Sequence, residues 1–217
     1  MSAEMLTLLL AALGETLLMV GVAGGAAIVL GVALGVLLVV TAPGGLLERP
    51  AFNRVLGAIV NAFRATPFII LLVALIPLTR WLVGTSIGTV AAIVPLAIAA
   101  IPFVGRITEN ALRDVPPGLV EAAHSMGATP GQIVRKVLLA EALPAIVGGL
   151  TITLISLVGF SAMAGAIGGG GLGDLGIRYG YQRFMPDVMA LVVAVLIGLV
   201  HLIQLAGDQL ARRFAHR

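Results

Sequence analysis

The stretch Gly118–Pro144, GLVEAAHSMGATPGQIVRKVLLAEALP, is the longest polar interruption in an otherwise apolar sequence. Its residues predict a helix, a break and a second helix. Pro116 and Pro117 precede it and end any earlier helix, because proline lacks a backbone N–H. The segment 119–126 is long enough for about two helical turns. Gly127 follows directly, and glycine readily adopts the left-handed conformation that commonly ends a helix.

The second helix has a complete start signal. Thr129 is a good N-cap, Pro130 suits the first helical position, and Gln132 completes a T-x-x-Q capping box. Such a box satisfies two backbone donors that would otherwise lack a partner at the start of the helix. We therefore expect this helix to run from Pro130 to about Leu139.

The first helix carries very small residues. Ala122 and Ala123 offer almost no side-chain bulk, so the backbone of another protein could approach closely. The order Glu121-Ala122-Ala123, three further residues and Gly127 resembles the EAA loop of ABC-importer permeases. The family pattern continues with nine residues and then I-x-L-P, whereas this chain has the apolar run 137–139 followed by alanine in place of the proline. This departure concerns the end of the second short helix.

The resemblance implies that this loop is a coupling element for a separate ATP-hydrolysing subunit. The residues that would contact that subunit are Glu121, Ala122, Ala123, Gly127, Ala128, Thr129 and Pro130. A solvated loop that happens to hold two alanines is the alternative that the spacing alone leaves open.

The composition predicts an all-α integral membrane protein. Of its 217 residues, 59% are hydrophobic and only 11% are charged, whereas soluble domains have about a quarter charged residues. The 28 glycines suit close helix–helix contact in lipid. The net charge of +3 gives no reason to expect a nucleic-acid partner, and the absence of cysteine excludes thiol chemistry.

Five apolar runs are each long enough to cross a membrane, and they form a single domain, 1–217, with the coupling loop between the third and fourth. We expect the spans at Thr16–Val40, Leu56–Leu78, Ile87–Val104, Ala145–Ile167 and Val188–Ala206. Met1–Gly14 is expected to be an interfacial piece and Thr41–Arg54 a loop. The N-terminus lacks a basic first region, so we expect no cleaved leader.

Arginine and lysine predict the orientation. With the coupling loop in the cytoplasm, ten of the 13 basic residues lie inside and three outside, as the positive-inside rule requires. The inner ten are Arg49, Arg54, Arg64, Arg106, Arg113, Arg135, Lys136, Arg212, Arg213 and Arg217; the outer three are Arg80, Arg178 and Arg183. The N-terminus is then outside and the C-terminus in the cytoplasm of a bacterial inner membrane.

Arg64-Ala65-Thr66-Pro67 lies near the start of the second span and resembles an R-x-T-P element of amino-acid-type ABC permeases. Arg64 can extend to the inner headgroups, and Pro67 frees a carbonyl and kinks the helix. A simple interfacial anchor with a kink and a role in the conduction path remain equally open.

The fourth span has one stripe of small and weakly polar residues. Gly149, Thr153, Ser156, Phe160 and Met163 follow each other at steps of 4, 3, 4 and 3, which places them on one helix face. This face is either a wall of the translocation path, with Thr153, Ser156, Phe160 and Met163 lining it, or a seam between helices.

Several other patterns in the sequence argue against a nucleotide-binding, metal-binding or catalytic site. Gly168–Gly173 fits G-x-G-x-x-G but follows a membrane span rather than a strand, so we interpret Gly168–Phe184 as a flexible outer or re-entrant loop. His124, His201 and His216 have no metal-ligand spacing. Glu15 and Asp208 are expected at membrane boundaries. No P-loop and no catalytic triad occur, so we expect no catalytic residue, no metal and no ATP hydrolysis by this chain.

Across almost its whole length the chain resembles the permeases of methionine ABC importers, a resemblance that also rests on SAMAGAIGGGGLG at positions 161–173. It implies a homodimer with a central path, two cytoplasmic ATPase subunits that hold ATP and Mg²⁺, and an external amino-acid-binding protein. The implied function is import of methionine, in both D and L forms, by alternating access. Five spans without an internal repeat are too few to enclose a path, which independently favours a dimer embedded in lipid.

Three alternatives remain open from the sequence. The first is an ABC permease for another amino acid or small solute. The second is an ion-coupled carrier, although such carriers often show internal repeats and ionisable residues at mid-membrane depth. The third is an intramembrane enzyme, which the lack of a nucleophile–base pair disfavours.

Overall fold

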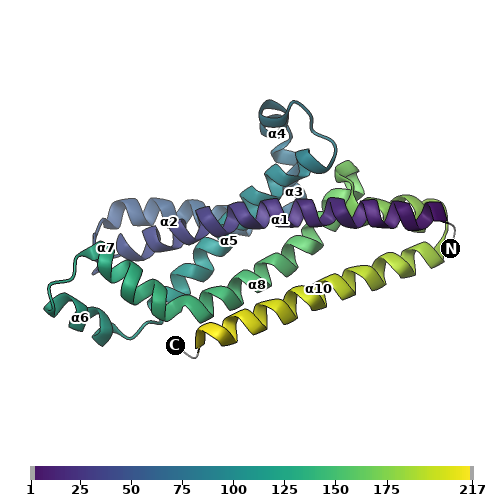
Figure 1. Ribbon diagram of the computed structural model, residues 1–217. Helices are drawn as coiled ribbons and strands as arrows, with labels where there is room; N and C mark the ends of the chain where they lie inside the picture. Colours follow the sequence, from purple (N-terminus) through teal and green to yellow (C-terminus); the bar gives the residue numbers. More distant parts are fainter. Residues whose placement is uncertain (1–2, 216–217) are drawn as a thin grey trace.

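The computed structural model describes residues 3–215, and every regular element in that range is helical. Four helices are long and apolar enough to cross a membrane: α1 (Ala3–Val40), α5 (Thr89–Arg113), the continuous helix Pro130–Gly169 that contains α8 (Leu139–Ala164), and α10 (Pro186–Ala215). They run side by side, and the N-terminal end of α1 and the C-terminal end of α10 lie at opposite ends of the bundle (Figure 1). Arg217 and His216, like Met1 and Ser2, lie outside the described residues.

The first helix contradicts one expectation. The described part of Met1–Gly14 is not a separate interfacial piece, because α1 continues through it as one helix of 38 residues. No proline interrupts this segment, and alanine and leucine favour helix. The observed loop after α1 is shorter than the expected loop, Thr41–Arg54, because α2 (Pro50–Ala65) already begins at Pro50.

The second span is not one helix. After α2 the chain bends by 106° into α3 (Phe68–Ala74), which is followed by α4 (Ile76–Val83). Thr66 has an extended backbone (φ −79°, ψ 123°) directly before Pro67, as proline disfavours the helical region for its neighbour. The sequence prediction of a kink was correct, but the prediction of a continuous span was wrong because the break is complete.

The fourth span also differs from the expectation. The helix α7 (Pro130–Ile133) does not end near Leu139 but passes through a π-helical turn, η1 (Val134–Leu138), directly into α8. Nothing in this segment is a strong helix breaker until Pro144, which lies inside α8. A π-turn accommodates an extra residue without ending a helix.

The glycine-rich segment is largely helical rather than an irregular loop, with a kink at Ile167 and Gly168 inside η2. It forms η2 (Gly165–Gly169), α9 (Gly171–Leu175) and η3 (Gly176–Tyr181). Glycine is required here by close packing, since a Cβ at Gly165 would lie 2.6 Å from the Asp174 nitrogen and one at Gly173 would lie 2.2 Å from the Ala162 carbonyl oxygen. The structure therefore corrects the expected loop to a series of short helical segments.

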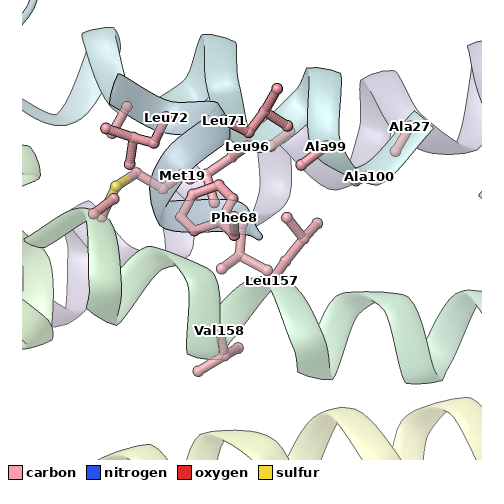
Figure 2. Packing of buried hydrophobic residues seen from close by; sticks show 14 of the residues in the cluster. Met19, Ala27, Phe68, Leu71, Leu72, Leu96, Ala99, Ala100, Leu157 and Val158 are labelled. Carbon is pink, nitrogen blue, oxygen red and sulfur yellow. The ribbon is translucent and has the colours of Figure 1, made fainter. Parts of the chain in front are cut away.

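The core lies where α1, α3, α5 and α8 meet. Met19, Leu96 and Leu157 are completely buried, and Phe68 of α3 lies between them (Figure 2). The helices α1 and α5 approach closely at glycines. A Cβ at Gly35 would lie 2.5 Å from the Thr108 Cβ and 2.6 Å from the Gly105 carbonyl oxygen.

This contact predicts a stability difference between two glycines of one helix. Gly35→Ala is expected to cost about 1–3 kcal/mol, because its methyl group meets backbone atoms of α5 that cannot move aside. Gly25→Ala has no atom within 4 Å of the added carbon and is expected to be neutral or slightly stabilising. Thermal unfolding of both variants in one detergent measures the difference; equal midpoints would contradict it.

Candidate functional site

The predicted coupling segment has the predicted backbone. The short helix α6 (Pro117–Ser125) ends before Gly127, which has a left-handed φ of +79°. The capping box is present: the Gln132 N–H donates to Thr129 Oγ1 at 3.4 Å, and the Thr129 N–H donates to Gln132 Oε1 at 2.9 Å. Pro130 is the first residue of α7. Both short helices were therefore correctly located from local sequence, apart from the end of the second.

The two sides of α6 are different. Ala123 is buried against Ile133 and Leu138 of the same chain, and Ala128 is half-buried in the same cluster. Glu121 and Ala122 are exposed, as are Gly127, Thr129 and Pro130. Figure 1 shows α6 at the end of the molecule that also holds the C-terminal end of α10. The exposed side of this segment can therefore meet another protein, while Ala123 holds the segment on its own chain.

A buried carboxylate near this end was missed by sequence reasoning. Glu109 is 3% exposed, and its Oε2 accepts from Arg106 Nη1 at 2.6 Å while its Oε1 accepts from Arg113 Nη2 at 2.9 Å. Arg106 Nη2 also donates to Asn61 Oδ1 of α2 at 2.7 Å. The spacing R-x-x-E-x-x-x-R on one helix face was the available signal. The network ties α2 to the end of α5 that leads into α6.

The residues expected at the kink lie near this network. The guanidinium carbon of Arg64 is 5.4 Å from the centre of the Phe103 ring of α5, which is a cation–π contact. Pro67 is the residue at which the chain turns into α3. Arg64 therefore links α2 and α5 as well as being exposed enough to reach a headgroup layer.

The stripe of the fourth span divides into two parts. At Gly149 a Cβ would lie 2.1 Å from Ile107 of α5, and the hydroxyl of buried Thr153 donates to the Gly149 carbonyl at 3.0 Å. Phe160 stacks on Phe68 with ring centres 4.6 Å apart. Ser156 is half-buried and Met163 is 40% exposed. Gly149, Thr153 and Phe160 thus form an intramolecular seam, and Ser156 and Met163 are left for an outward face.

The opposite end of the bundle holds a second polar contact. Glu15 Oε2 accepts from the Gly171 N–H at 2.6 Å, and Thr16 Oγ1 accepts from the Leu172 N–H at 2.9 Å. These bonds cap α9 from α1, so Glu15 has a structural partner that no local pattern in the sequence revealed. On the same segment, a hydrogen bond from Arg178 to the Asp174 carboxylate raises the pKa of Arg178.

The described residues contain no group of three His, Cys, Asp or Glu side chains that could hold a metal ion. The two ends of the bundle instead hold ion pairs, a buried carboxylate and helix caps. This arrangement positions helices relative to one another.

Comparison with known proteins decides the family. Residues 27–217 match the model of the family described as binding-protein-dependent transport system inner membrane component. The chain belongs to this family. It is therefore an inner-membrane permease with several apolar helices, and the sequence-based assignment to the ABC-importer permeases is confirmed.

Several relatives are similar over most of their length. The probable D-methionine transport system permease MetI of Vibrio cholerae is 59% identical over 210 residues, which cover 97% of this chain and 93% of the relative. MetI of Escherichia coli K12, a D-methionine permease, is 56% identical over 165 residues, 76% of each chain.

Solved structures agree with the fold. A chain of the methionine ABC transporter MetNI in an inward-facing conformation has a TM-score of 0.96 at 55% identity and covers 99% of both chains. A chain of an amino acid ABC transporter crystallised with histidines has a TM-score of 0.78 at 22% identity, which shows the fold alone.

The buried carboxylate gives the second prediction. Glu109→Gln is expected to lower stability by about 1–3 kcal/mol, because one charged hydrogen-bond acceptor between two arginines is lost. The exposed carboxylate of Glu48 serves as the control, and Glu48→Gln should leave the midpoint of thermal unfolding unchanged. An unchanged midpoint for Glu109→Gln would mean that this carboxylate does not stabilise the end of α5.

Proposed function

We propose that this chain is the membrane-spanning subunit of an ATP-driven importer of methionine, in both its D and L forms. The observation that carries the proposal is the similarity to the MetNI chain at 55% identity over 99% of both chains, supported by MetI relatives such as that of Vibrio cholerae. At this identity a shared substrate is a reasonable inference, whereas the fold alone would not support it.

The proposed assembly is supported by the similarity to the MetNI structure and by the geometry of the coupling segment. Two copies of the chain form the path between them, and two ATPase subunits, which hold ATP and Mg²⁺, bind at the exposed sides of the two α6–α7 segments. A protein that binds methionine docks at the opposite end, near α9 and η3. The residues proposed for ATPase contact are Glu121, Ala122, Gly127, Thr129 and Pro130, and Ala123 and Ala128 support them from within.

The connections of the coupling segment suggest how movement reaches the membrane. The segment α6 follows α5 after only a few residues, and α7 is continuous with α8 through η1. When the ATPases close, the two coupling segments move together and carry α5 and α8 with them. The network at Glu109 makes α2 move with α5. This rigid connection favours alternating access by rocking of whole helices.

Vesicle uptake tests the function directly. Sealed vesicles contain the permease in their membrane, with its ATPase and ATP on the inside. The binding protein and labelled amino acids are supplied on the outside. We expect ATP-dependent uptake of D- and L-methionine that requires the binding protein. Uptake of another amino acid in its place would favour a different importer specificity, and uptake driven by an ion gradient without the ATPase would contradict an ABC importer.

Thiol labelling tests the proposed orientation and path. The chain has no cysteine, so Thr85→Cys, Ser125→Cys and Met163→Cys each introduce a single thiol. In sealed cells a charged thiol reagent should label position 85 from outside, and position 125 only after the membrane is opened. Position 163, on the outward part of the α8 stripe with Ser156, should be labelled in the assembled transporter and be protected by methionine. Labelling of position 125 from outside in sealed cells would contradict the proposed orientation.

Two glycines of the coupling segment provide a matched pair. Neither has an atom within 4 Å of an added Cβ, but Gly127 has a φ of +79° and Gly131 is an ordinary helical residue. Gly127→Ala is expected to cost about 1–2 kcal/mol through its left-handed backbone and to reorient α6. It should reduce uptake while the dimer still assembles, and Gly131→Ala should transport normally. Equal uptake by both variants would show that the orientation of α6 does not matter.

A further inference from the structure

The exposed face of α10 has two unlike sides. One side is apolar, with Leu202 at 65% exposure. The other side carries His201, Gln204 and Asp208, which share a helix face because they are three and four residues apart. Gln204 Nε2 donates to Asp208 Oδ1 at 2.8 Å. The polar residues are therefore gathered along one edge of the exposed face.

His201 lies at the depth of the lipid hydrocarbon. The helix α10 has 30 residues, and His201 lies near its middle, about 22 Å from each end. The hydrocarbon core of a bilayer is about 30 Å thick, so His201 cannot lie in either headgroup layer when α10 crosses the membrane. Exposed polar and ionisable side chains at this depth are costly in lipid and usually face a protein interior or an aqueous cavity.

The polar edge borders a groove between α8 and α10. The groove has a volume of about 490 Å³ and is walled by apolar side chains, including Ile155, Val158 and Ile197. Gly159 contributes no side chain, which widens the groove on the α8 side. His201 and Gln204 are its polar lining residues. An apolar chamber with two hydrogen-bonding side chains suits a small molecule that has one apolar and one polar part.

The groove opens toward the exposed face of α8. Gly159 lies three residues after Ser156 and four before Met163, so these residues share the outward part of the stripe. Ser156 and Met163 are the residues proposed above to line the path. The groove therefore borders that surface at Gly159, while Leu202 on the other side of α10 suits contact with lipid.

We propose that this groove is a subsite for the transported amino acid inside the membrane. The apolar walls receive its side chain, and the imidazole of His201 and the carboxamide of Gln204 donate hydrogen bonds to its carboxylate. Asp208 holds Gln204 in place through the hydrogen bond between their side chains. The inference rests on the proposed function, because it takes methionine as the ligand.

Single cysteines test whether the groove is in the path. In the assembled transporter with its ATPase, His201→Cys should react with a charged, water-soluble methanethiosulfonate reagent, and methionine should slow that reaction several-fold. The neighbouring Leu202→Cys lies at the same depth on the apolar side and should not react. Thr85→Cys, at an exposed residue away from the coupling segment, is the positive control. Absence of reaction at position 201, with reaction at position 85, overturns the proposal.

Uptake separates failure of the subsite from failure of the proposed function. His201→Leu and Gln204→Leu are each expected to lower methionine uptake about tenfold, as the loss of a hydrogen bond to a charged group would. ATP hydrolysis and assembly should remain at the wild-type level, and Leu202→Ala should transport normally. If the wild type takes up methionine but methionine does not protect the thiol of His201→Cys, the subsite alone is overturned. Absence of methionine uptake by the wild type overturns the proposed function and this inference together.

Discussion

The backbones of α1 and α5 approach so closely that Gly31 and Gly35 have no room for a side chain. The other core helices pack on this pair. A Cβ at Gly31 would lie 2.9 Å from the Ile101 carbonyl oxygen. In lipid the hydrophobic effect does not drive helices together, so close packing at small residues has to supply the attraction. The core of Met19, Leu96 and Leu157 then forms where α8 and α3 pack on this pair.

Each break in the helices needs a substitute for the backbone hydrogen bonds that it removes. Asn53 Nδ2 donates to the Leu38 carbonyl at 2.6 Å, and the Leu47 N–H donates to the Val40 carbonyl at 2.8 Å, so the C-terminus of α1 is satisfied by the chain that follows it. At the other end of the bundle, Glu15 and Thr16 satisfy the N-terminus of α9. These contacts fix the direction in which the chain leaves each span.

Local patterns in the sequence predicted the features that depend on neighbouring residues. The left-handed Gly127, the capping box at Thr129 and a kink at Pro67 all follow from backbone chemistry within a few positions. Contacts between distant segments were not accessible in the same way. Nothing near Glu15 indicated that Gly171, far along the chain, would donate to it. The burial of Ala123 likewise depends on its contact with Ile133 and Leu138, which only the fold brings about.

The helix from Pro130 to Gly169 is longer than a membrane is thick. Before the non-helical residues Ile167 and Gly168, residues 130–166 follow a path of about 55 Å along the helix axis, whereas the hydrocarbon core measures about 30 Å. A large part of this helix therefore extends past the lipid, and the α6–α7 end stands in water beyond the headgroups. The surface that would meet an ATPase is thus held away from the bilayer, so a bulky soluble subunit can reach it without pressing against the lipid.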